Sequence, residues 1–320
     1  MPSDAGPFNL DLMLTRSCPL SCGYCRMEHT PGAMTKAVWR RAVELLLQES
    51  GPLELQFMGG EPLMEFSLLR EISAHAAGRA REAGTSLRQV VTTNGILLTP
   101  ARSLELAEMG CGVMLSLDGG RASQALQRPM RGTGAWTRLR RNLKGLLASG
   151  ARSFVNLVAT PASAPRLAEN AGFLFDEGVR SLQIAYALGV RWEPRDLDVL
   201  EEGLAAVCSL ARSARPRIDI FNRGGASEPV LLSPQHLVDC DGTLFVGTAI
   251  VLEKLWPGLQ TAFVAGNIMG MKRLPGRRAD RTGQLRRIKT APLDPAARDL
   301  LLNNLAVGQR MKRFWKEASR

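Results

Sequence analysis

The 320-residue sequence has few aromatic residues, few histidines and fewer acidic than basic side chains. Aromatic residues make up 5%, there are 3 His, and 41 Lys and Arg exceed 30 Asp and Glu to give a net charge of +11. Such an excess suits an anionic partner, namely nucleic acid, an acidic peptide or a nucleotide-like cofactor, although an arginine-rich composition alone also produces it. Because aromatic residues are scarce and no binding motif is recognisable, nucleic acid is the least favoured of these partners.

Long apolar runs are also missing, since no stretch approaches the roughly 20 apolar residues that a membrane span needs. The N-terminus MPSDAGPF has no basic segment followed by an apolar one, as a signal peptide would. We therefore expect a cytoplasmic protein. The chain is 45% hydrophobic and 22% charged, which is typical of a globular protein. Its length predicts one large domain with an appendage.

The six cysteines are too few and too clustered for a disulfide framework. Cys18, Cys22 and Cys25 fall close together, whereas Cys111, Cys208 and Cys240 stand alone. In a cytosolic chain, clustered cysteines indicate metal ligands.

Short apolar runs alternate with amphipathic segments over the first two-thirds of the chain, as in repeated β-α units around a parallel sheet. The predicted strands are Phe8–Thr15, Leu53–Met58, Arg88–Thr93, Gly112–Leu117, Phe154–Ala159 and Ser181–Ala187. The predicted helices are Thr35–Glu49, Pro62–Glu82, Pro100–Met109, Ala135–Ala148 and Ala164–Asp176. Six such units form a partial barrel or an open doubly wound sheet, and in both folds ligands gather at the carboxyl ends of the strands.

The pattern changes after Ala187, so we expect a core at residues 1–190 and a C-terminal extension at residues 191–320. The extension is predicted to hold a helix at about Arg195–Ala211, a strand at Ile218–Phe221, a hairpin over Leu237–Val251 that turns at Asp241-Gly242, and a helix from Pro295. Its basic segment, Lys272–Lys289, carries eight Lys and Arg residues without an apolar face. We expect a solvated loop there, or a segment that attracts an acidic peptide.

Cys18-Pro-Leu-Ser-Cys22-Gly-Tyr-Cys25 follows the first predicted strand with C-x-x-x-C-x-x-C spacing. Three thiolates on one loop can hold three corners of a [4Fe–4S] cluster and leave one iron open, as catalytic metal sites do. The alternative is a structural zinc site with His29 as the fourth ligand. Zinc sites of this kind usually contain a second C-x-x-C pair, which the sequence lacks.

This spacing, with Tyr24 before the last cysteine, resembles the motif of the radical S-adenosylmethionine (SAM) superfamily. The resemblance implies an α/β fold, a partial (β/α)6 TIM-like barrel with a smaller C-terminal α+β extension. It implies a [4Fe–4S] cluster on Cys18, Cys22 and Cys25, and SAM on the open iron. In that superfamily, reductive cleavage of SAM gives a 5'-deoxyadenosyl radical that abstracts hydrogen from the substrate. The resemblance also implies an external one-electron reductant such as flavodoxin or ferredoxin.

Residues at other strand ends extend the resemblance. Gly59-Gly60-Glu61-Pro62 resembles the GGEP element, whose backbone and glutamate, here Glu61, would hold the SAM ammonium group; two glycines also permit close backbone approach. Thr92-Thr93-Asn94-Gly95 and Ser116-Leu117-Asp118-Gly119 resemble motifs at the next two strand ends. By resemblance the candidates for SAM binding are Tyr24, Asn94, Ser116, Asp118, Arg128 for the methionine carboxylate, and Asn156 and Gln183 near the nucleoside. Ordinary turn composition is the alternative for several of them.

The order of these motifs most resembles the branch that modifies ribosomally made peptides. Members of that branch usually append a SPASM or twitch extension with auxiliary clusters, and residues 238–248 with Gly266-Asn267-Ile268 resemble its framing hairpin. Thr248 stands where a ligand is expected, and one nearby thiolate, Cys240, cannot hold a cubane. We therefore expect a degenerate extension without auxiliary iron. Cys240 is a candidate hydrogen donor for epimerisation, or a small buried residue.

The first hypothesis is thus a radical SAM enzyme that modifies a ribosomally made peptide by cross-linking, epimerisation or dehydrogenation. The basic segment would then suit an acidic leader peptide. Because seven residues precede the first predicted strand, we expect any leader-recognition domain to be a separate chain. The second hypothesis is a radical SAM enzyme for a small metabolite such as a sugar, nucleoside or amino acid. The third is a nucleic-acid-binding protein with a structural metal.

Overall fold

The computed structural model describes residues 7–224, 230–232, 235–247, 253–276 and 281–319. These residues form one ten-stranded sheet in the order β10-β9-β8-β1-β2-β3-β4-β5-β6-β7. Its central six strands are all parallel. They are β1 (Phe8–Thr15), β2 (Leu53–Gly59), β3 (Leu87–Thr93), β4 (Cys111–Ser116), β5 (Ser153–Ala159) and β6 (Ser181–Tyr186). All six predicted strands are confirmed, and no bound differs by more than one residue.

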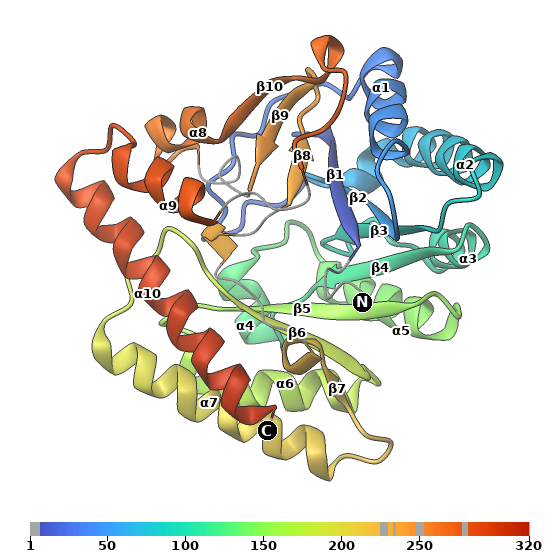
Figure 1. Cartoon of the computed structure of the whole chain (residues 1–320). Helices are drawn as coiled ribbons and strands as arrows, with labels where there is room; N and C mark the ends of the chain where they lie inside the picture. Colours follow the sequence, from blue (N-terminus) through green and yellow to red (C-terminus); the bar gives the residue numbers. More distant parts are fainter. Residues whose placement is uncertain (1–6, 225–229, 233–234, 248–252, 277–280, 320) are drawn as a thin grey trace.

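Helices connect these strands and cover the outer face of the curved sheet (Figure 1). They are α1 (Lys36–Leu46), α2 (Phe66–Glu82), α3 (Pro100–Glu108), α4 (Arg121–Gln127), α5 (Ala135–Ala148) and α6 (Leu167–Asp176), with the short turns η1 (Pro62–Glu65) and η2 (Ala164–Arg166). The arrangement confirms the predicted partial (β/α)6 barrel. The prediction of a helix as far as Glu49 is wrong, because α1 ends at Leu46.

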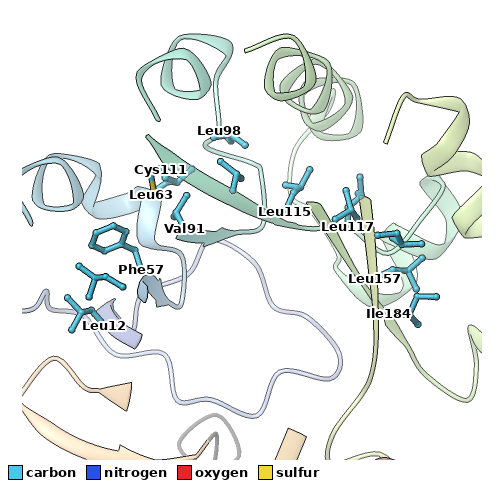
Figure 2. Close-up of a cluster of buried hydrophobic side chains, with 14 of the residues drawn as sticks. Leu12, Phe57, Leu63, Val91, Leu98, Cys111, Leu115, Leu117, Leu157 and Ile184 are labelled. Atoms are coloured by element: carbon cyan, nitrogen blue, oxygen red, sulfur yellow. The ribbon is translucent and has the colours of Figure 1, made fainter. Parts of the chain in front are cut away.

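The outward side of the strands is mostly apolar. Figure 2 shows Leu12, Phe57, Val91, Leu115, Leu157 and Ile184, one from each central strand, packed beneath the helices, and each is at most 1% exposed. Fully burying such a side chain contributes about 1.5–3 kcal/mol. Because side chains alternate across a strand, the neighbouring positions face the inside of the barrel, and many of these are polar, including Gln56, Thr92, Ser116, Asn156 and Gln183.

The short helix α4 is missing from the sequence-based prediction. Its buried side chains are Ser123, Gln124 and Gln127, whereas its apolar Leu126 is 64% exposed. An apolar period of 3.6 residues, the signal for a surface helix, is therefore absent. The buried glutamines instead hydrogen-bond to the barrel: Gln124 accepts from the Asp118 amide, and Gln127 donates to the Val158 carbonyl.

The C-terminal residues continue the same sheet on both sides. On the β6 side, β7 (Asp219–Ile220) lies parallel to β6. On the β1 side, β8 (His236–Val238) pairs parallel with β1, followed by the antiparallel strands β9 (Thr243–Val246) and β10 (Val264–Asn267). The predicted hairpin turn at Asp241-Gly242 is confirmed, and Gly242 has a φ of 87° there. Thr248 and the rest of residues 248–252 lie outside the described residues.

Helices complete the C-terminal part. They are α7 (Pro194–Ser213), α8 (Pro257–Phe263), α9 (Arg281–Thr290) and α10 (Pro295–Ala318), with the turns η3 (Phe221–Gly224), η4 (Val230–Leu232) and η6 (Ile268–Gly270). In Figure 1, α10 runs diagonally from α9 to α7. Its Leu301 and Leu305 pack in a second apolar cluster with Trp256 and Ile288.

The basic segment Lys272–Lys289 is not simply a solvated loop, because most of its second half forms α9. Ile288 of α9 is 2% exposed, and Leu274 is buried in the main core. Residues 277–280 lie outside the described residues. Among the helices that the structure describes, none is both long and apolar enough to cross a membrane.

Candidate active site

A cavity of about 300 Å³ opens at the carboxyl ends of the barrel strands. Part of its wall is the cysteine loop, residues 16–28, which follows β1. The strand ends supply Gly59 and Gly60, Thr92, Thr93 and Asn94, Ser116, Asn156 and Val158, and Tyr186. This is the end of the sheet at which the sequence predicted ligand binding, and ten of the fifteen predicted site residues line the cavity.

Cys18, Cys22 and Cys25 line this cavity together and are half-buried. The amide of Cys25 donates to the Cys22 carbonyl at 3.0 Å, and the Gly23 amide donates to the Gln127 carbonyl at 2.9 Å. The loop is therefore folded back on itself and held against the end of α4. Burial raises the pKa of the Cys22 thiol, and the positive charge of Arg128 opposes this rise.

The three thiols fit an iron–sulfur cluster better than zinc. His29 is near, with its Nε2 3.7 Å from Cys25 Sγ. Yet within the described residues no three His, Cys, Asp or Glu side chains are arranged to bind one metal ion. Each thiolate of a [4Fe–4S] site binds a different iron, so its sulfurs need not converge on one point.

Gly59 and Gly60 allow β2 to touch the start of the cysteine loop. A Cβ atom would stand 2.2 Å from the Thr15 carbonyl oxygen at Gly59, and 2.2 Å from the Ser17 carbonyl oxygen at Gly60. The Gly60 amide donates to Thr15 at 2.8 Å, and the Glu61 amide donates to Ser17 at the same distance. The close backbone approach expected for these glycines is thus present, and its partner is the loop itself.

The Glu61 carboxylate is fully buried and does not line the cavity. It accepts hydrogen bonds from the Thr93 hydroxyl at 2.7 Å, the Asn94 amide at 2.8 Å and the Leu63 amide at 3.0 Å. Burial raises its pKa, and these hydrogen bonds oppose the rise. The carboxylate joins the ends of β2 and β3, and a role for this side chain in holding the SAM ammonium group stays a prediction. The buried Pro62 begins η1 beside it and is also outside the cavity wall.

Asp118 is the centre of a buried polar cluster behind the cysteine loop. Its carboxylate accepts from the Tyr24 hydroxyl at 2.9 Å, from Arg128 Nε at 2.8 Å and from the Val158 amide at 3.0 Å. The guanidinium of Arg128 also lies 5.2 Å from the centre of the Tyr24 ring. Asp118 is 0% exposed and does not reach the cavity, whereas Tyr24 and Arg128 line it. Arg128 keeps further N–H donors for an anion after pairing with Asp118.

Asn156 carries an unused hydrogen-bond acceptor at the cavity. Its Oδ1 is buried and has no partner, and such an atom costs about 1–3 kcal/mol unless a ligand satisfies it. Ser116 and Asn94 line the cavity beside it, and Asn94 Nδ2 lies 3.7 Å from Cys18 Sγ. Gln183 is the neighbour of Asn156 on β6 but does not line the cavity. The unsatisfied acceptor and these polar side chains in a largely apolar wall fit a nucleoside.

Cys240 lies away from the cavity, at the turn between β8 and β9. Its thiol donates to the Met13 carbonyl at 3.1 Å, and it packs on a cluster that also includes Cys25. Burial raises its pKa to about 12. Cys240 is not among the residues that line the cavity, and its role as a hydrogen donor stays a prediction. Cys111 and Cys208 are buried in the main core.

Several residues of the cavity wall were not predicted. Arg26 follows Cys25, the last cysteine of the loop, and lines the cavity. Its Nε is buried, and its guanidinium has no hydrogen-bond or ion-pair partner among the described residues. Tyr186 ends β6, and its hydroxyl donates to the Asn304 carbonyl of α10 at 2.9 Å. The sequence offered one signal for each residue: Arg26 follows a cysteine, and Tyr186 ends a predicted strand. Neither signal distinguishes a residue that lines a cavity from one that is buried in the core.

The sequence profile of the Radical SAM superfamily matches residues 12–163. These residues form a radical SAM domain. The cofactors of this domain are those of the superfamily, a [4Fe–4S] cluster and SAM. Most residues that line the cavity belong to this domain, and Tyr186, Ala187 and Leu188 lie beyond its end. The lining residues fit both groups.

Known proteins resemble the chain to different extents. The GTP 3',8-cyclase of Synechococcus sp. (strain WH7803) is 40% identical over 119 residues, which are 35% of this chain and 34% of that protein. The PqqA peptide cyclase of Streptomyces rochei is 28% identical over 226 residues, which are 68% and 59%. The chain therefore matches less than two thirds of the length of either curated relative.

A solved structure matches almost the whole chain. Native anSMEcpe with bound AdoMet and the Kp18Cys peptide superposes with a TM-score of 0.74 at 17% identity, over 98% of this chain and 99% of that one. At this level of identity the similarity shows a shared fold. It includes the C-terminal residues as well as the barrel.

Proposed function

We propose that this radical SAM enzyme modifies a ribosomally made peptide by cross-linking, epimerisation or dehydrogenation. The observation that supports a peptide substrate most is the similarity to a PqqA peptide cyclase over 68% of the chain. The shared fold with a peptide-bound structure over almost the entire length adds to it. Near the hairpin of the C-terminal part there is one cysteine, Cys240, and one thiolate cannot hold a cubane. This supports a degenerate extension that carries no auxiliary cluster.

Residues of the cavity would hold the two cofactors. Cys18, Cys22 and Cys25 would bind the cluster, while the backbone at Gly59 and Gly60 would receive the SAM ammonium group. When bound, the two cofactors supply a carbon-centred radical that removes a hydrogen atom from the substrate. An acidic electron carrier of the flavodoxin or ferredoxin kind would suit the net charge of +11 as the reductant.

The protein's own side chains would position SAM and keep water away. Arg128, already oriented by Asp118, would pair with the methionine carboxylate, as a guanidinium does well. Ser116 and the unpartnered Oδ1 of Asn156 would receive polar groups of the nucleoside. Apolar wall residues such as Val158 and Leu188 would exclude water from the reacting atoms.

The cavity wall favours a substrate with a negative charge. The described lining includes Arg26 and Arg128 but no carboxylate. Arg128 is balanced by Asp118, so Arg26 remains without a counter-charge among the described residues. A carboxylate on an acidic peptide would supply one.

A second candidate is a radical SAM enzyme that acts on a small metabolite. The 40% identity with a GTP 3',8-cyclase favours it, although the match covers 35% of the chain. In this case the anionic group facing Arg26 would belong to the metabolite.

The deciding experiment is anaerobic co-expression with each short peptide encoded beside the gene, in ordinary and in deuterated water, followed by high-resolution mass spectrometry. Loss of hydrogens would indicate cross-linking or dehydrogenation, and deuterium gain without another change would indicate epimerisation. Unmodified peptides in cells whose enzyme carries its cluster and cleaves SAM would contradict the peptide proposal and favour the metabolite.

A further inference from the structure

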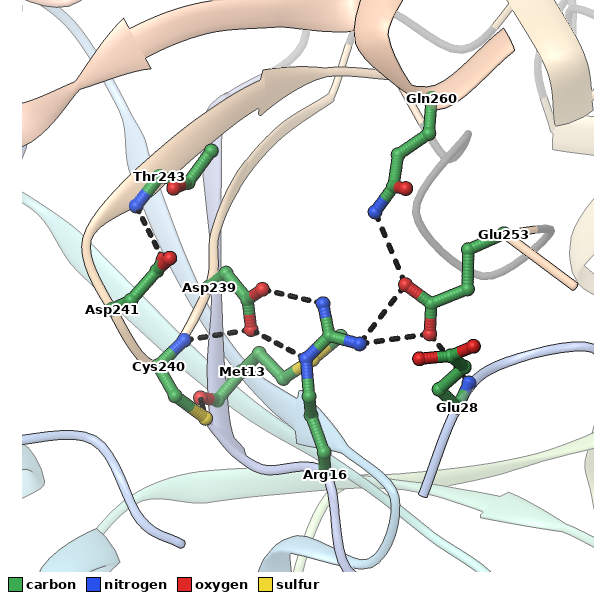
Figure 3. A network of polar contacts seen from close by, with 9 residues as sticks. All are labelled: Met13, Arg16, Glu28, Asp239, Cys240, Asp241, Thr243, Glu253 and Gln260. Carbon is green, nitrogen blue, oxygen red and sulfur yellow. Dashed lines mark hydrogen bonds and ion pairs between the residues drawn. The ribbon is translucent and has the colours of Figure 1, made fainter. Parts of the chain in front are cut away.

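The cysteine loop is held on its outer side by the C-terminal part of the chain. Arg16, two residues before Cys18, lies between Asp239 at the end of β8 and Glu253 before α8 (Figure 3). Its Nη2 and Nε contact the Asp239 carboxylate at 2.5 and 3.1 Å, and its Nη1 contacts both Glu253 oxygens at 2.8 and 3.0 Å. One guanidinium thus bridges two carboxylates that are 223 and 237 positions away in sequence.

The far end of the loop is bound to the same region. The amide of Glu28, three residues after Cys25, donates to the Glu253 carboxylate. The Lys254 amide donates to the Arg26 carbonyl at 3.1 Å, and Gln260 of α8 steadies Glu253 from behind at 3.1 Å. Glu253 is therefore bonded to residues on both sides of the three cysteines.

The ion pairs of Arg16 with Asp239 and Glu253 are shielded from water, and this shielding determines how much they contribute to holding the loop. The side chains of Arg16, Asp239 and Glu253 are 15%, 9% and 7% exposed. Surface pairs contribute little because water screens them, whereas removing one partner of a buried pair leaves an uncompensated charge. Without Arg16, the two carboxylates would face each other across the space that it fills.

The loop has a separate set of contacts on its inner side, with the barrel. These are the hydrogen bonds from the Gly60 and Glu61 amides, from the Gly23 amide to Gln127, and from the Tyr24 hydroxyl to Asp118. The cysteines therefore sit on a segment held from two sides. Loss of the outer contacts would free one side of the loop and leave the barrel folded.

We propose that Arg16, Asp239 and Glu253 form a loop clamp through which the C-terminal region sets the position of the cluster-binding cysteines. They are positioning residues, because they act on the cluster through the backbone of the loop. The proposal rests on the radical SAM site proposed above, but it does not depend on whether the substrate is a peptide.

The test compares variants of the full chain after anaerobic reconstitution with iron and sulfide. Arg16→Gln and Glu253→Gln each remove a charge from the loop clamp, while Arg16→Lys keeps the charge. Arg310→Gln is the control for loss of a more exposed arginine bridge, since Arg310 of α10 also joins two carboxylates, Asp198 and Glu201 of α7, away from the loop. The readouts are iron per chain, the rate of iron loss to a chelator, and the electron paramagnetic resonance spectrum of the reduced cluster with and without SAM.

We expect iron loss from Arg16→Gln and Glu253→Gln to be about tenfold faster than from the wild type, the low end of the effect on metal affinity when a residue that helps to orient a ligand is lost. The change in the resonance spectrum on SAM addition should also differ, Arg16→Lys should recover part of both effects, and Arg310→Gln should match the wild type. If Arg16→Gln does not fold, Glu253→Gln decides, because its amide nearly preserves the shape of the side chain.

Wild-type iron retention and spectra in both Gln variants would overturn the loop clamp. A wild-type chain that binds no cluster would instead overturn the radical SAM site itself. The two failures are therefore distinguishable.

Discussion

The hydroxyl of Tyr24 donates a hydrogen bond of 2.9 Å to the carboxylate of Asp118, which lies 94 positions further along the chain. This contact joins the middle of the cysteine loop to the carboxyl end of β4. Because Asp118 is fully buried and also pairs with Arg128, the loop is attached to a charged group that cannot move into water. The position of Cys22 and Cys25 thus depends on the barrel as well as on the loop.

Tyr24→Phe should weaken the fold by removing this hydrogen bond while keeping the ring. A hydrogen bond to a charged group contributes about 1.5–3 kcal/mol, so we expect a loss of that size in the free energy of unfolding. Tyr186→Phe is the control, since it removes a hydroxyl that donates to a neutral carbonyl, that of Asn304. Denaturant unfolding measures both, and an equal or larger loss in the control would contradict the role of Asp118.

Gly60→Ala should displace the cysteine loop. Its new Cβ would meet the Ser17 carbonyl oxygen at 2.2 Å, and backbone atoms cannot rotate away as a side chain would. We expect reconstituted iron per chain to fall severalfold. Gly78→Ala, in the interior of α2 with no atom within 4 Å, is the control and should stabilise the fold by about 0.5–1 kcal/mol. Full iron content in the Gly60 variant would show that this contact is not needed.

The strand positions could be predicted because the barrel has a clear apolar pattern. Leu12, Phe57 and Val91 alternate with inward-facing residues, so each strand is visible as a short apolar run bounded by turn residues. The helix α4 could not be predicted because its buried face consists of Ser123, Gln124 and Gln127. The partners of the two glutamines are Asp118, just after β4, and Val158 in β5, and a local pattern does not contain them.

The candidate site could be predicted only in part: the sequence shows which residues follow the strands, but not where their side chains point. Residues at strand ends, such as Ser116 and Asn156, line the cavity because parallel strands end at one edge of the sheet. The direction of a side chain is a different matter. Glu61 turns toward Thr93 and Asn94, Cys240 toward Met13, and Arg16 toward residues more than two hundred positions away. Spacing along the chain carries no information about such contacts.

Arg26→Gln should weaken substrate binding without affecting SAM. A charged hydrogen bond contributes about 1.5–3 kcal/mol, so the Km for an anionic substrate should rise by about tenfold or more. SAM cleavage in the absence of substrate should be unchanged. Arg166→Gln, which removes an exposed arginine paired with Glu169, is the control. A rise in the Km for SAM, with the Km for substrate unchanged, would show that Arg26 serves the cofactor instead.

Asp11→Asn should change how stability depends on pH. Burial raises the pKa of Asp11 to about 8, and the charge of Glu54 adds to this. In the unfolded chain the pKa is about 3.9, so the folded chain binds the extra proton between these values and loses stability as the pH rises through them. Asparagine resembles the protonated acid and has no such slope.

The Asp11→Asn substitution should therefore stabilise the chain at about pH 8 and have a smaller effect at about pH 5. Denaturant unfolding of both proteins at several pH values between these limits measures the difference. Parallel curves for the wild type and the variant would mean that Asp11 is ionised in the folded chain.

The most direct test of the central claim is an iron and SAM assay of the wild type beside a variant in which Cys18, Cys22 and Cys25 are all replaced by Ala. After anaerobic reconstitution and reduction, the wild type should bind about four irons per chain, as one [4Fe–4S] cluster requires, and release 5'-deoxyadenosine from SAM. The variant should do neither. Substantial iron in the triple variant, or a cluster-loaded wild type that leaves SAM intact, would contradict the account.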